Sequence, residues 1–573
     1  CGIIGYAGQR EAAPLVLDGL KQLEYRGYDS WGIATVNNEL RVEKRVGKIE
    51  GVGESELSKL LGSVGVGHSR WATHGGVTRE NAHPHVDCKN EIAVVHNGII
   101  DNYVELRNEL EARGHAFKSQ TDTEVIPHLI EEEIAAGAGF TEAVLKTARK
   151  LNGSFALAVL NTRDPNTLVG VRNESPLIVG LGASEFFVAS DVLAFLNSTK
   201  KVVYLNDGEL VTACKSPAGL DITFTDLAGN RIEKNSVEVS WDAESAEKRG
   251  YPHYMLKEIM EQPAALRNAL NQDLDYVQQF AEDLKKANVI AIACGTARHS
   301  AVVGKHLFDK IAGKQIEVMI ASEFAYFADN VPKDAIVLAV SQSGETADVL
   351  EGLKKAKARG ARIYSIVNVV GSTIARLSDK VIYINAGPEI GVASTKAFVN
   401  QVGVFYMLAY AIAGKIEEGL QDLKHASALV EKTLNENDVR MRALAEKIKT
   451  KKDVYFIGRG VNFPIALEGA LKLKEISYIH AEGMPAGELK HGTIALIEKG
   501  VPVIALNPRD YTFSDTVSNA METKARGAFV IGVSSEKHEC YDEFIQLPDV
   551  EKQSNGEPRP YYLLLEIIPL QIL

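Results

Sequence analysis

Short apolar segments alternate with turns through the first 238 residues. Segments such as EIAVVHNGII (91–100) and SFALAVLNT (154–162) are typical of strands, and Gly, Asn and Asp turns separate them. Apolar residues at helical spacing predict helices over Glu11–Leu23 and Glu124–Ala135. We therefore expect residues 1–238 to form one α+β domain.

The pattern changes at SWDAESAEKRG (240–250), which is charged and turn-prone, and YPHYMLKEIMEQP (251–263) then begins like a helix. We interpret residues 239–250 as a linker.

An internal repeat follows the linker. VIAIACGTARHSAVVG (289–304) aligns with DVYFIGRGVNFPIALEG (453–469), AIVLAVS with VPVIALN, and KARGA occurs twice, all at nearly one spacing. Each copy has the strand, Gly loop and helix order of a parallel sheet with crossover helices. The repeat predicts two doubly wound α/β domains, residues 251–430 and 431–573, with ligands at the carboxyl ends of the strands.

Composition narrows the functional classes. The 573 residues are 45% hydrophobic and 24% charged, as in globular proteins, and the net charge of −12 argues against a nucleic-acid binder. The longest apolar run, 402–414, is shorter than the ~20 residues that span a bilayer, and the start lacks a signal-peptide pattern. We expect no membrane contact and a cytoplasmic location.

The five cysteines, at positions 1, 88, 214, 294 and 540, form no CxxC pair. This spacing predicts neither a disulfide framework nor a zinc site. His74, His83, His85 and His96 also lack tight ligand spacing, so we expect no metal.

A cysteine as residue 1 suggests that an initiator residue is removed, leaving a free α-amine beside a thiol. Such an amine can act as the base for its own nucleophile. The alternative is a chain that simply starts here. In the same domain, Arg70 and Asp122 could bind the carboxylate and ammonium of an amino acid, and Asn97 with the Gly98 amide could stabilise an oxyanion.

Three loops of the second half could bind a phosphorylated sugar. SQSGET (341–346) follows an apolar strand and precedes a helix, which suits a phosphate monoester, although a plain Ser/Thr cap would look the same. CGTARHS (294–300) and GVASTKAF (391–398) add hydroxyls and amides.

Glu468, Lys472 and Glu475 share one helix face, with His491 shortly after. They form either a proton-transfer set or a surface ion-pair ladder.

These segments resemble a known family. The residues Cys1–Gly5, LEYRGYDS, RWATHG, NAHPH, HNGIIDN and TDTE are similar to an N-terminal-nucleophile glutaminase domain with an αββα sandwich. ACGT, SQSGET, GVASTKAF, ALEGALKLKE and GELKHG resemble paired sugar isomerase (SIS) domains. Together they indicate the glutamine–fructose-6-phosphate aminotransferase family. The resemblance implies that amide nitrogen passes from glutamine to fructose 6-phosphate, the first step of hexosamine and UDP-N-acetylglucosamine synthesis.

The resemblance also implies roles for individual residues. Cys1 would attack glutamine, Asn97 and Gly98 would hold the oxyanion, Glu475 with Lys472 would move a proton on the sugar, and His491 of a neighbouring subunit in a homodimer would open its ring. The glutamine would be held by Arg26, Arg70, Trp71, Thr73, His83, Gly98 and Asp122. The phosphorylated sugar would be held by Cys294, Gly295, Thr296, Ser341, Gln342, Ser343, Thr346, Val392 and Ser394.

The family implies neither a metal nor an organic cofactor. Its members usually end in a polar tail with a further catalytic lysine, and we expect such a tail beyond PLQIL (569–573). Two alternatives are another cysteine-first amidotransferase and a non-catalytic sugar-phosphate sensor, which would bind without turnover.

Overall fold

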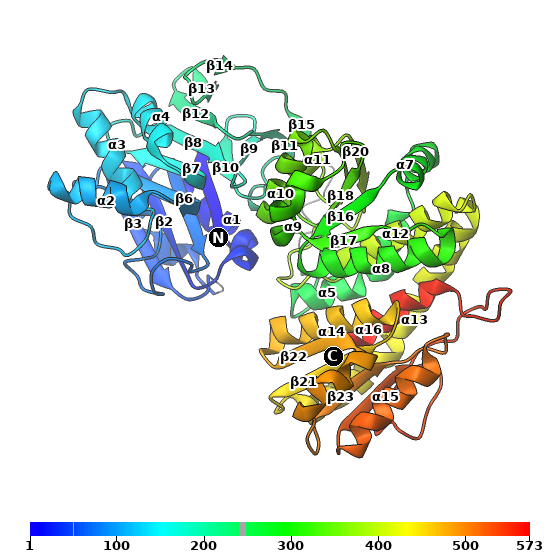
Figure 1. Cartoon of the computed structure of the whole chain (residues 1–573). Helices are drawn as coiled ribbons and strands as arrows, with labels where there is room; N and C mark the ends of the chain where they lie inside the picture. The colour runs from blue at the N-terminus through cyan, green and yellow to red at the C-terminus, as the bar shows by residue number, and fades with distance from the viewer. Residues whose placement is uncertain (50, 240–247) are drawn as a thin grey trace. The chain divides into compact units, whose positions relative to one another are not determined.

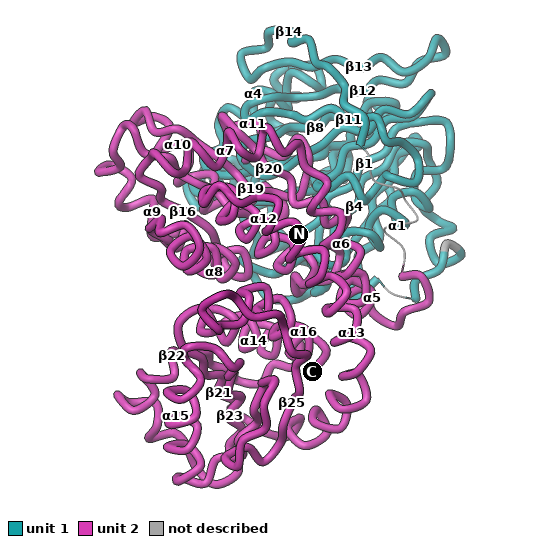
Figure 2. The backbone as a smooth tube through the Cα atoms, turned by 90° about the vertical axis from the view of Figure 1, so that its right-hand side faces the viewer, with its two compact units in different colours: residues 1–246 teal, residues 247–573 magenta. Residues whose placement is uncertain are grey.

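The computed structural model describes residues 1–49, 51–239 and 248–573. The chain divides into two compact units, Cys1–Ala246 (unit 1) and Glu247–Leu573 (unit 2), which Figure 2 colours separately. Residues 240–247 of the predicted linker lie outside the described residues.

Unit 1 is a sandwich of two antiparallel sheets. In spatial order, the first sheet contains β15 (Val237–Glu238), β11 (Lys201–Tyr204), β9 (Ile178–Leu181), β10 (Phe186–Ala189), β1 (Gly2–Ala7), β4 (Val64–Arg70), β2 (Ser30–Asn37) and β3 (Glu39–Val46). The second sheet contains β14 (Arg231–Ile232), β13 (Gly219–Asp226), β12 (Glu209–Ser216), β8 (Thr167–Asn173), β7 (Gly153–Asn161), β6 (Ile92–Ile100) and β5 (His85–Val86).

Helices cover the outer faces of both sheets (Figure 1). They are α1 (Ala12–Leu23) on the first sheet, and α2 (Tyr103–Ala112), α3 (Val125–Ala135) and α4 (Phe140–Lys150) on the second. Side chains of a strand alternate between faces, so Ala93 and Val95 of β6 lie between the sheets while Ile92 and Val94 contact the helices. The predicted αββα sandwich is confirmed, and α1 and α3 match the two predicted helices.

Unit 2 contains two parallel five-stranded sheets. Their spatial orders are β17 (Glu317–Ile320), β16 (Val289–Ala293), β18 (Ile336–Ser341), β19 (Arg362–Val367), β20 (Lys380–Tyr383), and β22 (His480–Pro485), β21 (Asp453–Gly458), β23 (Pro502–Leu506), β24 (Phe529–Ser534), β25 (Glu543–Gln546). Numbered within each copy, both orders read 2-1-3-4-5, a doubly wound arrangement whose direction reverses between the first and third strands. The repeat predicted from the sequence is confirmed.

The helices of unit 2 are α5 (Tyr254–Met260), α6 (Gln262–Ala269), α7 (Leu274–Lys286), α8 (Gly295–Ala312), α9 (Ala321–Phe327), α10 (Ala347–Ala358), α11 (Thr373–Leu377), α12 (Lys396–Ile412), α13 (Ile416–Ile448), α14 (Asn462–Ser477), α15 (Phe513–Ala525) and α16 (Leu563–Ile572). Most of these helices share one core with both sheets, while α9, α10 and α11 pack in a second cluster on the first sheet and α15 in a third on the second sheet.

The long helix α13 runs through residue 430, so the predicted boundary between the two SIS domains falls inside a continuous helix and stays a prediction. The apolar run 402–414 belongs largely to α12, which is buried along its whole length. In the described parts of the chain, no helix is both long and apolar enough to cross a membrane.

Candidate active sites

Cys1 is fixed at the start of β1 by its backbone and its thiol. The α-amine donates to the Arg26 carbonyl at 2.5 Å, and the Cys1 carbonyl accepts from Arg26 Nε at 3.3 Å and Asn97 Nδ2 at 3.2 Å. The Trp71 amide lies 3.3 Å from the thiol sulfur. Three of the predicted site residues therefore contact Cys1 directly.

The α-amine of Cys1 has an environment that favours its neutral form. Burial, and then the positive charge of Arg26, lower its pKa from about 8.0 to about 5. At neutral pH the amine is therefore free to accept the proton of the neighbouring thiol.

Asn97 has its amide orientation set by two residues that the sequence analysis did not select, His68 and Ser190. His68 Nε2 lies 3.0 Å from Asn97 Oδ1 and 2.9 Å from the His96 carbonyl, and because both are acceptors, this nitrogen carries the proton. Asn97 Nδ2 in turn donates to Ser190 Oγ at 2.8 Å as well as to Cys1. The Asn97 amide nitrogen is therefore held between the Cys1 backbone carbonyl and the Ser190 hydroxyl.

Gly98 follows Asn97 at the exposed end of β6 and has a φ of +125°. A Cβ at this position would lie 1.9 Å from the Ser154 carbonyl oxygen, so the backbone here accommodates only glycine.

The other predicted glutamine residues surround this centre. The Arg70 guanidinium, at the end of β4, donates to the carbonyls of His74, Gly75 and Gly76 within 3.1 Å and so shapes the loop that carries exposed Trp71 and Thr73. Asp122 is buried and accepts from the Ile100 amide at 2.9 Å, two residues after Gly98.

His83 lies one layer behind Asn97. Its ring packs against His68 at 4.1 Å and His85 at 4.7 Å between centroids. Burial lowers the pKa of all three histidines well below the usual value, so they are neutral. His83 therefore contacts the residue that orients Asn97. The sequence did contain a sign of this role for His68. Side chains two residues apart on a strand lie on the same face, and His68 stands two residues before the predicted site residue Arg70 in HSRWATHG.

A pocket of about 180 Å³ opens at the carboxyl ends of β16 and β18, where the strand order of the first parallel sheet reverses. Seven of the nine predicted sugar residues line it: Cys294, Thr296, Ser341, Gln342, Ser343, Thr346 and Ser394. Gln401 also lines it and was not predicted. Among the described residues, neither Gly295 nor Val392 belongs to the lining, and Val392 is 60% exposed.

The hydroxyls of the SQSGET loop do not serve only as a cap for α10, which is the alternative interpretation of this sequence. Thr346 occupies the N-cap position without a side-chain capping bond, and its hydroxyl lies 3.0 Å from Ser341 Oγ. The Glu345 carboxylate accepts from the amide and hydroxyl of Thr373, both at 2.7 Å. Hydroxyls and the N-terminus of α10 therefore face one pocket, as phosphate binding requires.

Of Glu468, Lys472 and Glu475 on α14, the first two are buried and so do not form a surface ladder, whereas Glu475 is exposed. Glu468 and Lys472 are 0% and 1% exposed, and Lys472 Nζ lies 2.8 Å from Glu475 Oε2, 3.3 Å from Glu468 Oε1 and 3.1 Å from the pocket residue Thr296. Burial alone would lower the pKa of Lys472, but Glu468 and Glu475 outweigh it and raise this pKa, so the ammonium stays charged.

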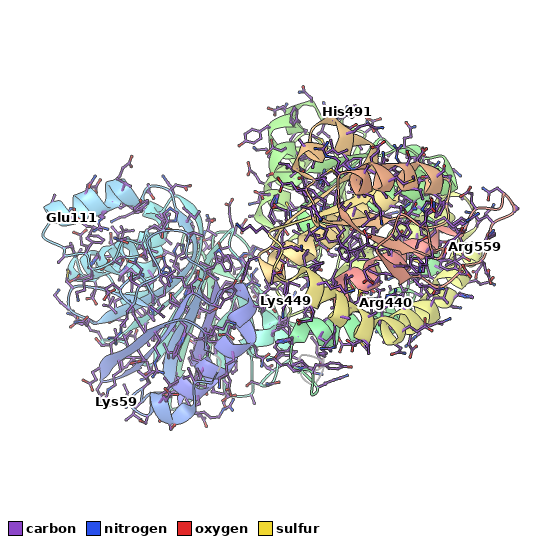
Figure 3. The ribbon with its side chains drawn as sticks, turned by 90° about the horizontal axis from the view of Figure 1, so that it is seen from below. Lys59, Glu111, Arg440, Lys449, His491 and Arg559 are labelled. Carbon is purple, nitrogen blue, oxygen red and sulfur yellow. The ribbon has the colours of Figure 1, made fainter. Side chains whose placement is uncertain are left out.

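Two further buried groups support the pocket. His299 Nδ1 lies 2.7 Å from Glu468 Oε2, and Glu389 accepts from Ser394 Oγ at 2.7 Å and from the Thr395 amide at 2.8 Å. His491, in contrast, is exposed on the short helix η6 (Ala486–His491) at the surface of unit 2 (Figure 3).

Known proteins match both halves. The glutamine amidotransferase domain family matches residues 68–197, and the SIS domain family matches residues 284–411 and 447–544, one segment in each copy of the repeat. The isomerizing glutamine–fructose-6-phosphate aminotransferase of Thermococcus kodakarensis is 47% identical over 587 residues, covering 100% of this chain and 96% of that protein. The protein of the same name from Methanothermobacter thermautotrophicus is 47% identical over 580 residues with the same coverage.

A solved structure is similar to unit 2. It is the C-terminal domain of glucosamine-fructose-6-phosphate aminotransferase from Francisella tularensis, which is 36% identical with a TM-score of 0.53 and covers 57% of this chain and 96% of that chain.

Proposed function

This chain belongs to the family of isomerizing glutamine–fructose-6-phosphate aminotransferases, and we propose how its residues divide the work of that reaction. The enzyme transfers the amide nitrogen of L-glutamine to D-fructose 6-phosphate and isomerises the product to D-glucosamine 6-phosphate, with L-glutamate as the second product.

In unit 1, the α-amine of Cys1 takes the thiol proton and the sulfur attacks the amide carbon of glutamine. Asn97 and the Gly98 amide stabilise the oxyanion, and the amine then returns the proton to the leaving nitrogen, which departs as ammonia. A γ-glutamyl thioester remains on Cys1, and water releases it as glutamate. Arg26, Arg70, Trp71, Thr73 and Asp122 hold the substrate, and His83 acts through His68 and Asn97.

In unit 2, the hydroxyls of Ser341, Ser343 and Thr346 bind the phosphate of fructose 6-phosphate. Ammonia condenses with the C2 carbonyl of the open sugar, and water leaves. Glu475 then removes a proton from C1 and returns it to C2, while the imine nitrogen gains a proton and the O1 hydroxyl loses one, which gives the amine and the aldehyde of the product. Lys472 remains protonated and orients Glu475.

The surroundings of Cys1 are the main support for the proposed glutaminase reaction. The thiol lies beside its own neutral amine, and the Asn97 amide nitrogen lies 3.2 Å from the Cys1 carbonyl oxygen. The non-catalytic sensor leaves this arrangement without a purpose. A homodimer in which His491 serves the partner's sugar, and a cytoplasmic location, remain predictions.

The test follows glucosamine 6-phosphate formation from fructose 6-phosphate with either glutamine or ammonia as the nitrogen source. Cys1→Ala should abolish the glutamine-driven reaction and retain sugar-phosphate binding and the ammonia-driven reaction. A Cys1→Ala enzyme that still hydrolyses glutamine at the wild-type rate would show that the nucleophile lies elsewhere.

A further inference from the structure

Four side chains of unit 1 converge outside the glutamine site. Cys88 lies in the loop between β5 and β6, His115 follows α2, and His128 and Glu131 are one turn apart on α3. One ligand atom from each lies within 4.8 Å of the others. None of the four was selected from the sequence, because they come from three separate segments.

Their separations match those of a tetrahedral metal site. Cys88 Sγ lies 3.6 Å from both His115 Nδ1 and His128 Nδ1, the two Nδ1 atoms are 3.3 Å apart, and Glu131 Oε2 is 3.4 Å and 3.7 Å from them. Zinc bonds of ~2.3 Å to sulfur and ~2.0–2.1 Å to nitrogen and oxygen place tetrahedral ligands about 3.3–3.6 Å apart. Five of the six separations therefore match a tetrahedral zinc site, and the sixth, between Cys88 Sγ and Glu131, is no more than 4.8 Å.

The orientation of each ligand is fixed from behind. His115 Nε2 lies 3.4 Å from Glu132 Oε1, which favours the proton on Nε2 and directs the Nδ1 lone pair inward. The Lys89 ammonium occupies the other carboxylate oxygen of Glu131 at 3.0 Å. The ring of Phe117 packs on His128 at 4.7 Å between centroids. These contacts leave sulfur, nitrogen and oxygen donors facing one point.

The loop that carries Cys88 is also held in place by hydrogen bonds. The Asp87 carboxylate accepts from the amides of Glu91 at 2.7 Å and Ile92 at 2.8 Å, which closes a tight turn that presents Cys88. His128 is 1% exposed and Cys88 is exposed, so the site has a buried side and an open entry side. A thiolate and a carboxylate together neutralise a divalent cation.

We propose that Cys88, His115, His128 and Glu131 bind one zinc ion, which joins the β5–β6 loop, the end of α2 and helix α3. Zinc accepts imidazole nitrogen, thiolate sulfur and carboxylate oxygen as ligands, and four protein ligands leave no coordination position open for catalysis, so the ion is structural. The ion stabilises the segments that carry the glutamine residues: Asn97 and Gly98 lie near the end of β6, and Asp122 lies shortly before the start of α3.

The experiment uses the full chain in the Cys1→Ala background, because an N-terminal aminothiol chelates metals by itself. The chelator-treated protein is titrated with Zn²⁺ against a competing chromophoric chelator, and with Co²⁺ to detect thiolate-to-cobalt charge-transfer absorption. We expect one tight site per chain, the cobalt band, and a rise in the melting temperature with Zn²⁺.

Cys88→Ser should weaken zinc affinity at least tenfold and remove the cobalt band, and because Cys88 is exposed, this variant should still fold. Glu131→Gln should weaken zinc affinity but keep the band. Cys214→Ser, in the same unit but on β12, is the matched control and should behave as the parent. Absence of the band in the parent, or equal zinc affinity in the parent and Cys88→Ser, would overturn the proposal.

Discussion

Our proposal makes the α-amine of Cys1 the base of glutamine hydrolysis, so the pKa of this amine should set how the rate responds to pH. Only the neutral amine can accept the thiol proton, and its pKa of about 5 keeps it neutral above that pH. We expect kcat/KM for glutamine hydrolysis to rise with pH through about 5 and to reach its plateau by neutral pH. An unperturbed amine would place this rise near ~7.7–8.0. Initial rates of glutamate release across this range distinguish the two cases, and a rise near 8 would contradict our assignment of the base.

Asn97 is the residue whose loss should most clearly separate catalysis from binding in unit 1. Removing one oxyanion donor typically lowers kcat about 10²–10³-fold. We expect Asn97→Ala to lower kcat for glutamine hydrolysis by that factor with a smaller change in KM. Asn102→Ala, at the N-cap of α2, is the control and should keep wild-type kinetics. Equal loss in both variants would indicate general damage to the fold.

Among single residues, the sequence predicts those that belong to a motif, such as the N-terminal cysteine, the HNG segment or a short loop rich in Ser and Thr. Cys1, Asn97 and Ser341 were found in this way. His68, Ser190, His299 and Glu389 were not, because they act through neighbours that are distant along the chain: Ser190 reaches Asn97 only after the two sheets pack. His83 shows the same limit, since its position behind Asn97 depends on ring contacts that no motif encodes.

Among the elements, helix α14 shows how burial decides between two interpretations of one pattern. The spacing of Glu468, Lys472 and Glu475 predicted a shared face but not whether that face meets water. Helices α8 and α16 both pack against α14, and the apolar sequence LLLEIIPLQI of α16 is buried in this core. The ion pairs therefore lie beside the sugar pocket.

Breaking this buried charge set should be costly. Lys472→Met leaves Glu468 buried with, among the described residues, only the hydrogen-bond partners His299 and Thr296 beside it, and removing one member of a buried ion pair typically destabilises by about 3–5 kcal/mol. We expect Lys472→Met to lose the sugar step and to lower the urea midpoint of unit 2 accordingly. The double variant Glu468→Gln/Lys472→Met should recover a large part of that stability without recovering activity. If the double variant is less stable than Lys472→Met, the pair does not act as described.

The order of the strands could be predicted from the sequence better than the boundary between the two SIS domains. The repeat predicts the same strand order in both copies, and both sheets have it. The sequence gives no sign of where one copy ends, because α13 is a single amphipathic helix of 33 residues that spans residue 430 and packs in the core shared by both copies. A repeat identifies similar units, but shared packing decides where one stops.

For the whole molecule, the division into two compact units predicts two separate responses to ligands. A ligand that binds only the native form of a unit stabilises that unit by about 2.7 kcal/mol at a hundredfold excess over its Kd. For a unit of 246 residues, such a gain raises the melting temperature by roughly 5–10 °C. In calorimetry of the Cys1→Ala chain, which binds glutamine without consuming it, we expect glutamine to shift one transition and fructose 6-phosphate to shift the other. Glutamate lacks the amide, so we expect it to shift the first transition less. A single transition that both substrates move equally would show that the chain unfolds as one cooperative body.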